Sequence, residues 1–409
     1  MATETIINRL IQNSKTLASK PAVYRKVNGA WTSLTWKEYA DLVQRTGRAF
    51  MALGFQPGQV VTILSNNRLE WVTSDLAAMA AGGVATGIYQ TCTDEQVAYI
   101  VRHAESPICV VENADQLDKL RARRSELPAL KWVVLLDGSV PETERQWVLH
   151  WDDLLKKAEA VPAQAFDDRV ADLQPDALAT LIYTSGTTGD PKGVMLSHRN
   201  LTWTADSLKE ISPTDVDHAG VSYLPLSHIA EQMLSLHLAI TMGSAIWFAE
   251  SIEKLKENLV DARPTIFFGV PRVWEKFEAV LAGRFKEATG FKATMLAFSR
   301  NTATEVNKVR EQGHTPSGLL ALKYAIANKL VLSKLKRALG FDRCLHFVSG
   351  AAPISRSTLE FFQSIDIVIK EVYGQSEDCG PTSMNRIDRW KLGTVGPAIP
   401  GVEIKIAED

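Results

Sequence analysis

The residues best suited to chemistry lie in one segment, Tyr183–Gly193, which reads Tyr-Thr-Ser-Gly-Thr-Thr-Gly-Asp-Pro-Lys-Gly. Its glycines permit positive φ angles and a close approach of the backbone to a ligand. Its hydroxyl groups and its lysine are donors suited to phosphate oxygens. The composition therefore predicts a loop that wraps a polyphosphate. The residues concerned are Thr184, Ser185, Gly186, Thr187, Thr188, Gly189, Lys192 and Gly193.

The segment differs from the phosphate loop of P-loop NTPases. That loop places Ser or Thr directly after the lysine and then opens a helix. Here Gly193 follows Lys192, and the apolar run Val194–Leu196 comes next without a helix signature. An apolar strand, Ala179–Tyr183, is expected before the segment, so the phosphate-binding residues would follow a buried strand.

Three later segments complete an ordered set of motifs. They are Ser349–Pro353 (Ser-Gly-Ala-Ala-Pro), Tyr373–Glu377 (Tyr-Gly-Gln-Ser-Glu) and the Gly/Pro-rich run Gly393–Gly401. Together with the Tyr183–Gly193 segment, they resemble the adenylate-forming superfamily of acyl-CoA synthetases, luciferases and peptide-synthetase adenylation domains. The resemblance covers essentially the whole chain.

Two further segments resemble one branch of that superfamily. Ser222–Gln232 and Gly269–Lys276 are similar to the corresponding segments of long-chain acyl-CoA synthetases of the bubblegum type. The resemblance implies a ligase that uses ATP and Mg²⁺ to convert a long-chain fatty acid to acyl-AMP, releases pyrophosphate, and then forms a thioester with CoA. Two alternatives remain: a fatty-acyl-AMP ligase that acylates a carrier protein, and a non-catalytic acyl or nucleotide sensor.

The resemblance also implies roles for individual residues. Glu377 would hold Mg²⁺ together with the hydroxyl of Thr184, and Ser376 would reach the α-phosphate. Tyr373 would pack on adenine, and His228 would lie beside the substrate carboxylate. The catalytic set is Lys192, His228, Ser376 and Glu377, and the nucleotide set beyond the phosphate loop is Gly350, Ala351, Glu371, Val372, Tyr373, Gly374, Gln375 and Ser376.

Each of these roles has a simpler structural alternative. His228 could be a satisfied loop histidine, and Tyr373 an ordinary core residue. Ser376 could form a local turn through its hydroxyl, and Glu377 could belong to a surface ion pair. The residue types alone leave these alternatives open.

The 409 residues exceed the size at which a single core usually stops growing. Apolar strand-like runs alternate with helical patterns, which predicts an α/β protein of two subdomains, each a mostly parallel sheet flanked by helices. The approximate lobes are 1–175 and 176–409, and the polar, proline-containing stretch 137–175 is expected to connect them. The resemblance adds a small β-barrel-like part. It also implies that 1–409 is a large N-terminal adenylation domain that lacks a small C-terminal domain.

Local signals predict several elements in detail. Asn28-Gly29 is typical of a tight hairpin turn. Thr35 with Glu38, and Thr93 with Gln96, have the spacing of capping boxes that begin helices. Helical patterns cover 273–310 and 317–339. The second pattern carries a basic face that is either a solvated surface or a site for a membrane or the CoA phosphates: Lys323, Lys329, Lys334, Lys336 and Arg337.

Composition excludes other classes of function. The chain has 45 Lys and Arg against 47 Asp and Glu, so it has no overall positive field to gather nucleic acid. Its four cysteines lack the spacing of a zinc site or a disulfide framework, which favours a reducing, cytoplasmic location. Peripheral association with the inner face of a membrane, the oligomeric state and the preferred acyl chain length stay open.

Overall fold

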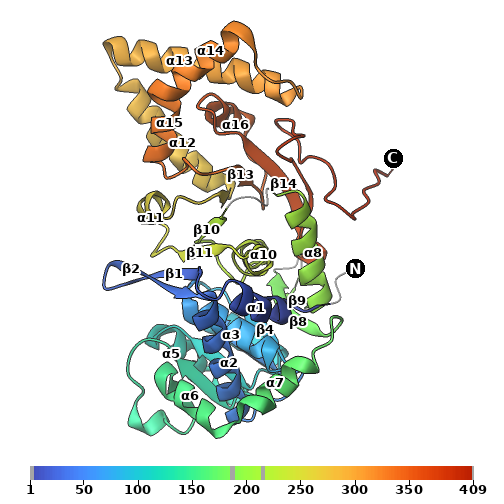
Figure 1. Ribbon diagram of the computed structural model, residues 1–409. Coiled ribbons are helices and arrows are strands. Elements are labelled where there is room, and N and C mark those ends of the chain that lie inside the picture. Colours follow the sequence, from blue (N-terminus) through green and yellow to red (C-terminus); the bar gives the residue numbers. More distant parts are fainter. Residues whose placement is uncertain (1–3, 185–188, 213–216, 408–409) are drawn as a thin grey trace. The chain divides into compact units, whose positions relative to one another are not determined.

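The computed structural model describes residues 4–184, 189–212 and 217–407. The chain divides into two compact units (Figure 1). The first consists of Met1–Asp206 and Ser222–Glu250, and the second of Ser207–Val221 and Ser251–Asp409. The short strand β10 (Ala219–Ser222) begins in the second unit and ends in the first. The lobe boundary expected near residue 175 falls inside the first unit, because the strands on both sides of it belong to one sheet.

A seven-stranded sheet organises the first unit. Its order is β7-β6-β5-β3-β4-β8-β9, and every neighbouring pair is parallel except β8 and β9. The three central strands are buried along their whole length, as expected for parallel strands covered on both faces. The strands are β3 (Val60–Leu64), β4 (Val84–Gly87), β5 (Ile108–Val111), β6 (Trp132–Leu135), β7 (Val148–His150), β8 (Leu178–Thr184) and β9 (Lys192–Ser197).

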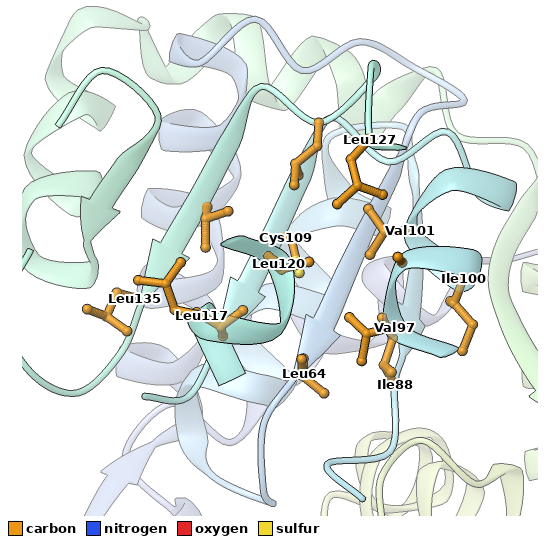
Figure 2. Packing of buried hydrophobic residues seen from close by; sticks show 14 of the residues in the cluster. Leu64, Ile88, Val97, Ile100, Val101, Cys109, Leu117, Leu120, Leu127 and Leu135 are labelled. Carbon is orange, nitrogen blue, oxygen red and sulfur yellow. The ribbon is translucent and has the colours of Figure 1, made fainter. Parts of the chain in front are cut away.

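Apolar side chains from two helices pack on one face of this sheet (Figure 2). Val97 and Val101 of α4 (Asp94–His103), and Leu117 and Leu120 of α5 (Ala114–Ala122), pack against strand residues such as Cys109. The capping boxes predicted at Thr35 and Thr93 are present and begin α2 and α4. The helices of this unit are α1 (Ile6–Thr16), α2 (Trp36–Ala52), α3 (Leu69–Ala80), α4 (Asp94–His103), α5 (Ala114–Ala122), α6 (Trp151–Lys157), α7 (Ala163–Ala171), α9 (Ile229–Gln232) and α10 (Leu238–Met242). Helix α8 (His198–Glu210) begins in this unit and ends in the second.

The prediction that 137–175 is connecting structure between lobes is wrong. Strand β7 within it pairs with β6 through Val133–Val148 and Leu135–His150 and extends the seven-stranded sheet. Helices α6 and α7 also lie in this stretch, and their buried residues include Leu154. The stretch is therefore part of the first unit. Its prolines and polar residues resemble those of a connecting segment, so these short elements could not be recognised from the sequence.

A smaller sheet of the first unit contains the predicted hairpin. Strands β1 (Pro21–Val27) and β2 (Ala30–Thr35) are antiparallel around Asn28 and Gly29, both at positive φ. Strand β11 (Ala245–Phe248) runs parallel to β1 on its other side. The described strands form open sheets with a linear order, so the expected barrel-like part is an open sheet here. Edge strand β2 is mostly exposed or half-buried, which suits an edge that meets no further strand.

The second unit is built on a four-stranded sheet of order β12-β13-β14-β15. β12, β13 and β14 are parallel, whereas β15 is antiparallel to β14. The strands are β12 (Ile266–Gly269), β13 (His346–Ser349), β14 (Ile369–Gln375) and β15 (Gly380–Met384). Trp274 lies at the centre of an aromatic core, where its Nε1–H donates to the carbonyl of Val348 at 3.2 Å.

Helices cover this second sheet, and the helical character predicted for 273–310 and 317–339 is confirmed. The first pattern is interrupted at residues 287–289, so it forms two helices instead of one. A π-helical turn, Asn328–Leu332, interrupts the second. The helices are α11 (Leu255–Ala262), α12 (Pro271–Lys286), α13 (Gly290–Glu311), α14 (Gly318–Ala327), α15 (Ser333–Ala338) and α16 (Arg356–Gln363). Among the described residues, no helix combines the length and the apolar character needed to cross a bilayer.

One buried carboxylate ties three of these helices to the turn before β14. Asp366 accepts hydrogen bonds from Lys336 at 2.6 Å, Tyr324 at 2.8 Å and Arg310 at 3.0 Å, and its side chain is only 4% exposed. Burial alone would raise the pKa of Asp366. The attraction of Lys336 and Arg310 and the hydrogen bonds outweigh burial, so the pKa is lowered.

We expect Asp366→Asn to destabilise the second unit by about 3 kcal/mol at pH 7. This is the lower end of the range for breaking a buried ion pair, because Lys336 and Arg310 keep partial contact with solvent. The folded-state pKa lies below the unfolded value, so the stabilisation is present above the unfolded pKa of about 3.9. It is lost as the pH falls through the folded-state pKa. Urea unfolding of both proteins at several pH values measures the difference.

Glu360→Gln is the matched control. Glu360 pairs with Arg356 on an exposed helix surface, at 2.8 Å, and the pair should contribute well under about 1 kcal/mol. If both variants lose equally little stability, the Asp366 cluster does not hold the helices as described.

Candidate functional site

The predicted phosphate segment is the connection of a β-hairpin. Strands β8 and β9 are antiparallel, with Thr184 opposite Lys192 and Tyr183 opposite Gly193. The strand expected before the segment is confirmed, and the apolar run after it is also a strand. Gly189 adopts a φ of +89°, which favours glycine. The predicted residues Ser185, Gly186, Thr187 and Thr188 lie outside the described residues.

An aromatic cluster supports both strands of this hairpin. The hydroxyl of Tyr183 lies 2.8 Å from Nδ1 of His103, whose ring stacks on Tyr99. The Tyr99 hydroxyl donates to the carbonyl of Pro191 at 3.1 Å, directly before Lys192. Burial raises the pKa of Tyr183 to about 12, so its hydroxyl stays protonated. The hairpin is therefore fixed from α4 at the two residues that flank Thr184 and Lys192. The sequence motifs gave no signal for Tyr99 or His103.

His228 is half-buried and caps helix α9. Its Nδ1 accepts the backbone N–H of Ala230 at 3.1 Å, so Nδ1 carries no proton. Burial lowers the pKa of His228, which favours the neutral ring. A neutral imidazole with a bare Nδ1 has its proton on Nε2. The Nδ1 atom of His228 is therefore used within the loop, whereas its Nε2–H can donate a hydrogen bond. A carboxylate is a suitable acceptor for this donor.

Glu231, which the sequence reasoning missed, holds the loop before His228. Its carboxylate is buried and accepts a hydrogen bond from the Ser235 hydroxyl at 2.6 Å. The Ser222 hydroxyl and the backbone N–H groups of Tyr223 and Leu224 also bond to it. Burial is the largest effect and raises the pKa of Glu231 to about 7 despite these donors. An acidic residue inside the apolar pattern of 222–233 was the available signal.

In the second unit, parallel pairing of β13 with β14 aligns two predicted nucleotide segments. Ser349 is opposite Glu371, so the backbone beyond Ser349 continues beside Val372. A Cβ added to Gly350 would lie 2.5 Å from Cγ1 of Val372. Ala351 adopts a φ of +66° and is exposed. Gly350 thus permits β13 and β14 to approach each other closely. The left-handed conformation of Ala351 then turns the chain away from the end of β13.

The Tyr373–Glu377 motif spans the end of β14 and the short 3₁₀ turn Ser376–Asp378. Tyr373 is 51% exposed, which rules out its alternative as a core residue. A Cβ on Gly374 would collide with the carbonyl of Gly380 on β15. Ser376 is half-buried and Glu377 is exposed, and the structure shows no ion pair of Glu377 within its described residues. Gln375 is exposed as the last residue of the strand.

Glu371 and Val372 are half-buried, and the Glu371 carboxylate has a clear structural contact. It accepts the backbone N–H of Gly393 at 2.8 Å, while its own carbonyl accepts the N–H of Asn385 at 3.1 Å. Burial raises the pKa of Glu371 against the effect of the hydrogen bonds. This residue therefore attaches the Gly393–Gly401 motif to the strand that carries Tyr373.

Comparison with known proteins identifies the family. The AMP-binding enzyme family matches residues 11–409. The chain belongs to this family. The long-chain-fatty-acid–CoA ligase ACSBG2 of Xenopus laevis is 38% identical over 94% of this chain, and the human protein of that name is 36% identical over 93%. The chain spans 52% and 57% of those two proteins, so it corresponds to somewhat more than half of each.

Two solved structures share the fold of this chain. The anthranilate CoA ligase AuaEII, solved with anthranoyl-AMP, matches the whole chain with a TM-score of 0.73 at 17% identity and is covered over 67% of its length. The N-terminal domain of FACL13 from Mycobacterium tuberculosis matches 97% of the chain with a TM-score of 0.70 at 18% identity and is covered over 83%. At these identities the likeness establishes the α/β fold.

We expect Gly350→Ala to destabilise the second unit by about 1–3 kcal/mol. Its Cβ would press on the branched side chain of Val372 and on the Phe268 ring, which lies 3.2 Å away, and overpacking of this kind forces neighbours to shift. Gly283→Ala in α12 is the control. No atom lies within 4 Å of its added Cβ, and alanine is the better helix former. Thermal melting should show opposite signs for the two variants, and equal signs would contradict the close approach of β13 and β14.

Proposed function

We propose that the protein that carries this chain is a long-chain fatty acid:CoA ligase of the AMP-forming type. It uses ATP to form a fatty acyl-AMP with release of pyrophosphate and then transfers the acyl group to CoA. The observation that carries the proposal is the hairpin with Thr184 opposite Lys192, fixed by the aromatic cluster, in a member of the AMP-binding enzyme family. The names of the curated relatives support the choice of acid.

The chain's own residues supply distinct parts of this chemistry in the proposal. Lys192 and the hydroxyls of the hairpin bind the phosphates and stabilise the departing pyrophosphate. The Nε2–H of His228 donates to the fatty-acid carboxylate. Ser376 contacts the α-phosphate. Tyr373 presents an exposed ring at the strand end, where it stacks on adenine beside Gly350 and Ala351.

The donor set is compatible with Mg²⁺. A carboxylate and a hydroxyl are the hard oxygen ligands that this ion prefers, and it usually keeps several waters and substrate phosphates as its other ligands. In the described residues no group of three or more His, Cys, Asp or Glu is placed to hold a metal. Glu377, exposed at its turn, and Thr184 are the proposed ligands. When bound, Mg²⁺ neutralises charge on the phosphates.

The proposal includes the partners and the location. Long-chain fatty acid, ATP and CoA are the substrates, and the protein works in the cytoplasm with peripheral contact to a membrane. Nucleic acid is not among the proposed partners, because the net charge of −2 gives the whole chain no overall attraction for it.

A pyrophosphate-release assay tests the assignment. We expect turnover with ATP and palmitate to exceed that with acetate by at least about 100-fold. Burying many methylenes at about 0.8 kcal/mol each favours the long chain strongly. Addition of CoA should convert the product to palmitoyl-CoA. Equal rates with both acids would refute the long-chain assignment. Accumulation of acyl-AMP that CoA does not consume would indicate an acyl-AMP ligase, and no pyrophosphate at all would indicate a sensor.

Glu377→Gln should lower the rate of adenylation by about 100-fold or more while the melting temperature stays unchanged. The amide keeps the size of the side chain but loses the negative charge, and electrostatic contacts made in the transition state are worth this much. The defect should shrink as Mg²⁺ is raised. Glu403→Gln, another exposed carboxylate of the second unit, is the control and should behave as wild type. A normal rate for Glu377→Gln at limiting Mg²⁺ would remove Glu377 from the metal site.

A further inference from the structure

Helix α14 and the π-helical turn after it expose a continuous apolar stripe. Leu319, Leu322, Ile326 and Leu330 are 68%, 59%, 43% and 45% exposed. Their spacing of three or four residues places them along one side of the helix. Scattered exposed leucines are normal on protein surfaces, but an aligned group of four marks an interaction site.

The opposite side of α14 and of the turn after it packs against α13. Tyr324, Ala327 and Leu332 form a core cluster with Phe298 and Ala303 of α13. Figure 1 shows α13 and α14 lying side by side. The exposed stripe is therefore not the surface by which α14 packs in its own unit, and no fold-stabilising role accounts for its four large apolar side chains.

The part of the chain that carries the apolar stripe is rich in basic residues and has no acidic ones. Residues 312–341 contain five Lys or Arg and no Asp or Glu. Lys336 and Arg337 are committed to Asp366 and Asp342. The remaining three, Lys323, Lys329 and Lys334, are exposed, and the structure shows no ion pair for them among its described residues.

We propose that this face of α14 docks on the surface of an anionic phospholipid membrane. A helix with an apolar face flanked by lysines lies in the plane of a membrane interface, with its apolar side chains inserted. The lysine stems extend along the apolar surface, and their ammonium groups reach the lipid phosphates.

Charge decides between a membrane and a second copy of the chain. A two-fold contact through the same face would place Lys323, Lys329 and Lys334 opposite identical lysines, with no acid between residues 312 and 341 to balance them. An anionic lipid surface complements both the apolar stripe and its charge. The inference rests on the membrane contact included in the proposed function and names the surface that makes it. It does not depend on the proposed catalytic residues, so it can fail while the ligase activity holds.

The test is cosedimentation with vesicles that contain equal parts of phosphatidylglycerol and phosphatidylcholine, compared with pure phosphatidylcholine. We expect binding to the anionic vesicles to be about 100-fold stronger, because three lysines contribute about fivefold each, and we expect most of that difference to disappear in about 0.5 M salt, where screening is nearly complete. The variant with Leu322→Ser and Ile326→Ser should bind at least about tenfold less. Replacement of Lys323, Lys329 and Lys334 by Gln should lower binding to anionic vesicles by about 100-fold, since each lysine contributes about fivefold.

Matched controls lie on α12 of the same unit. Val280 is 50% exposed, and Lys286 is also exposed. Val280→Ser with Lys286→Gln should bind as wild type, and all variants should melt as wild type because the altered side chains are on the surface. Three results would overturn the proposal: no binding to anionic vesicles, equal loss in the α12 control, or wild-type binding by both α14 variants. Self-association that the α14 variants abolish, without any vesicle binding, would assign the stripe to a second copy instead.

Discussion

The parallel pairing of β13 with β14 is the constraint on which the predicted nucleotide segments of the second unit depend. Parallel strands end at the same edge of a sheet, and the register Ser349–Glu371 brings Gly350 beside Val372. From this edge the chain continues into Ala351 on one side and Tyr373 on the other. Glu371 in turn holds Gly393, so a third motif is attached to the same strand. Three backbone segments, around Gly350, Tyr373 and Gly393, thereby share one support.

In the first unit, side chains as well as strand pairing hold the predicted phosphate hairpin in place. The hairpin of β8 and β9 is fixed where Tyr183 meets His103 and where Tyr99 meets Pro191. Burial raises the pKa of the Tyr183 hydroxyl to about 12, so this partner of the contact stays protonated. Of the two side chains that support the hairpin, Tyr99 is half-buried and His103 is exposed. In both units, predicted site residues such as Lys192, Gly350 and Tyr373 lie at or near strand ends. This arrangement is typical of ligand sites in α/β proteins, where loops at strand ends carry chemistry and the sheet supplies rigidity.

Elements that depend on neighbouring residues could be predicted from the sequence. A capping box needs only Thr35 and Glu38, and a hairpin turn only Asn28 and Gly29, so both could be recognised from neighbouring residues. The stretch 137–175 could not, because the three residues of β7 become a strand only by pairing with β6. The supports of the site were missed for the same reason. His103 lies 80 residues from Tyr183, and Glu231 reads as an outlier in an apolar run until its donors are seen.

Because α4 supports the hairpin, the loop could not be transferred into another protein by itself. The eleven residues 183–193 form a compact sequence cassette, but the aromatic rings that hold its two ends come from residues 80 and 92 positions away. A graft of the cassette alone would leave the Tyr183 hydroxyl and the Pro191 carbonyl without their partners. The smallest portable module is therefore the hairpin together with α4 and its Tyr99–His103 pair, a discontinuous unit that recombination at a single crossover would separate.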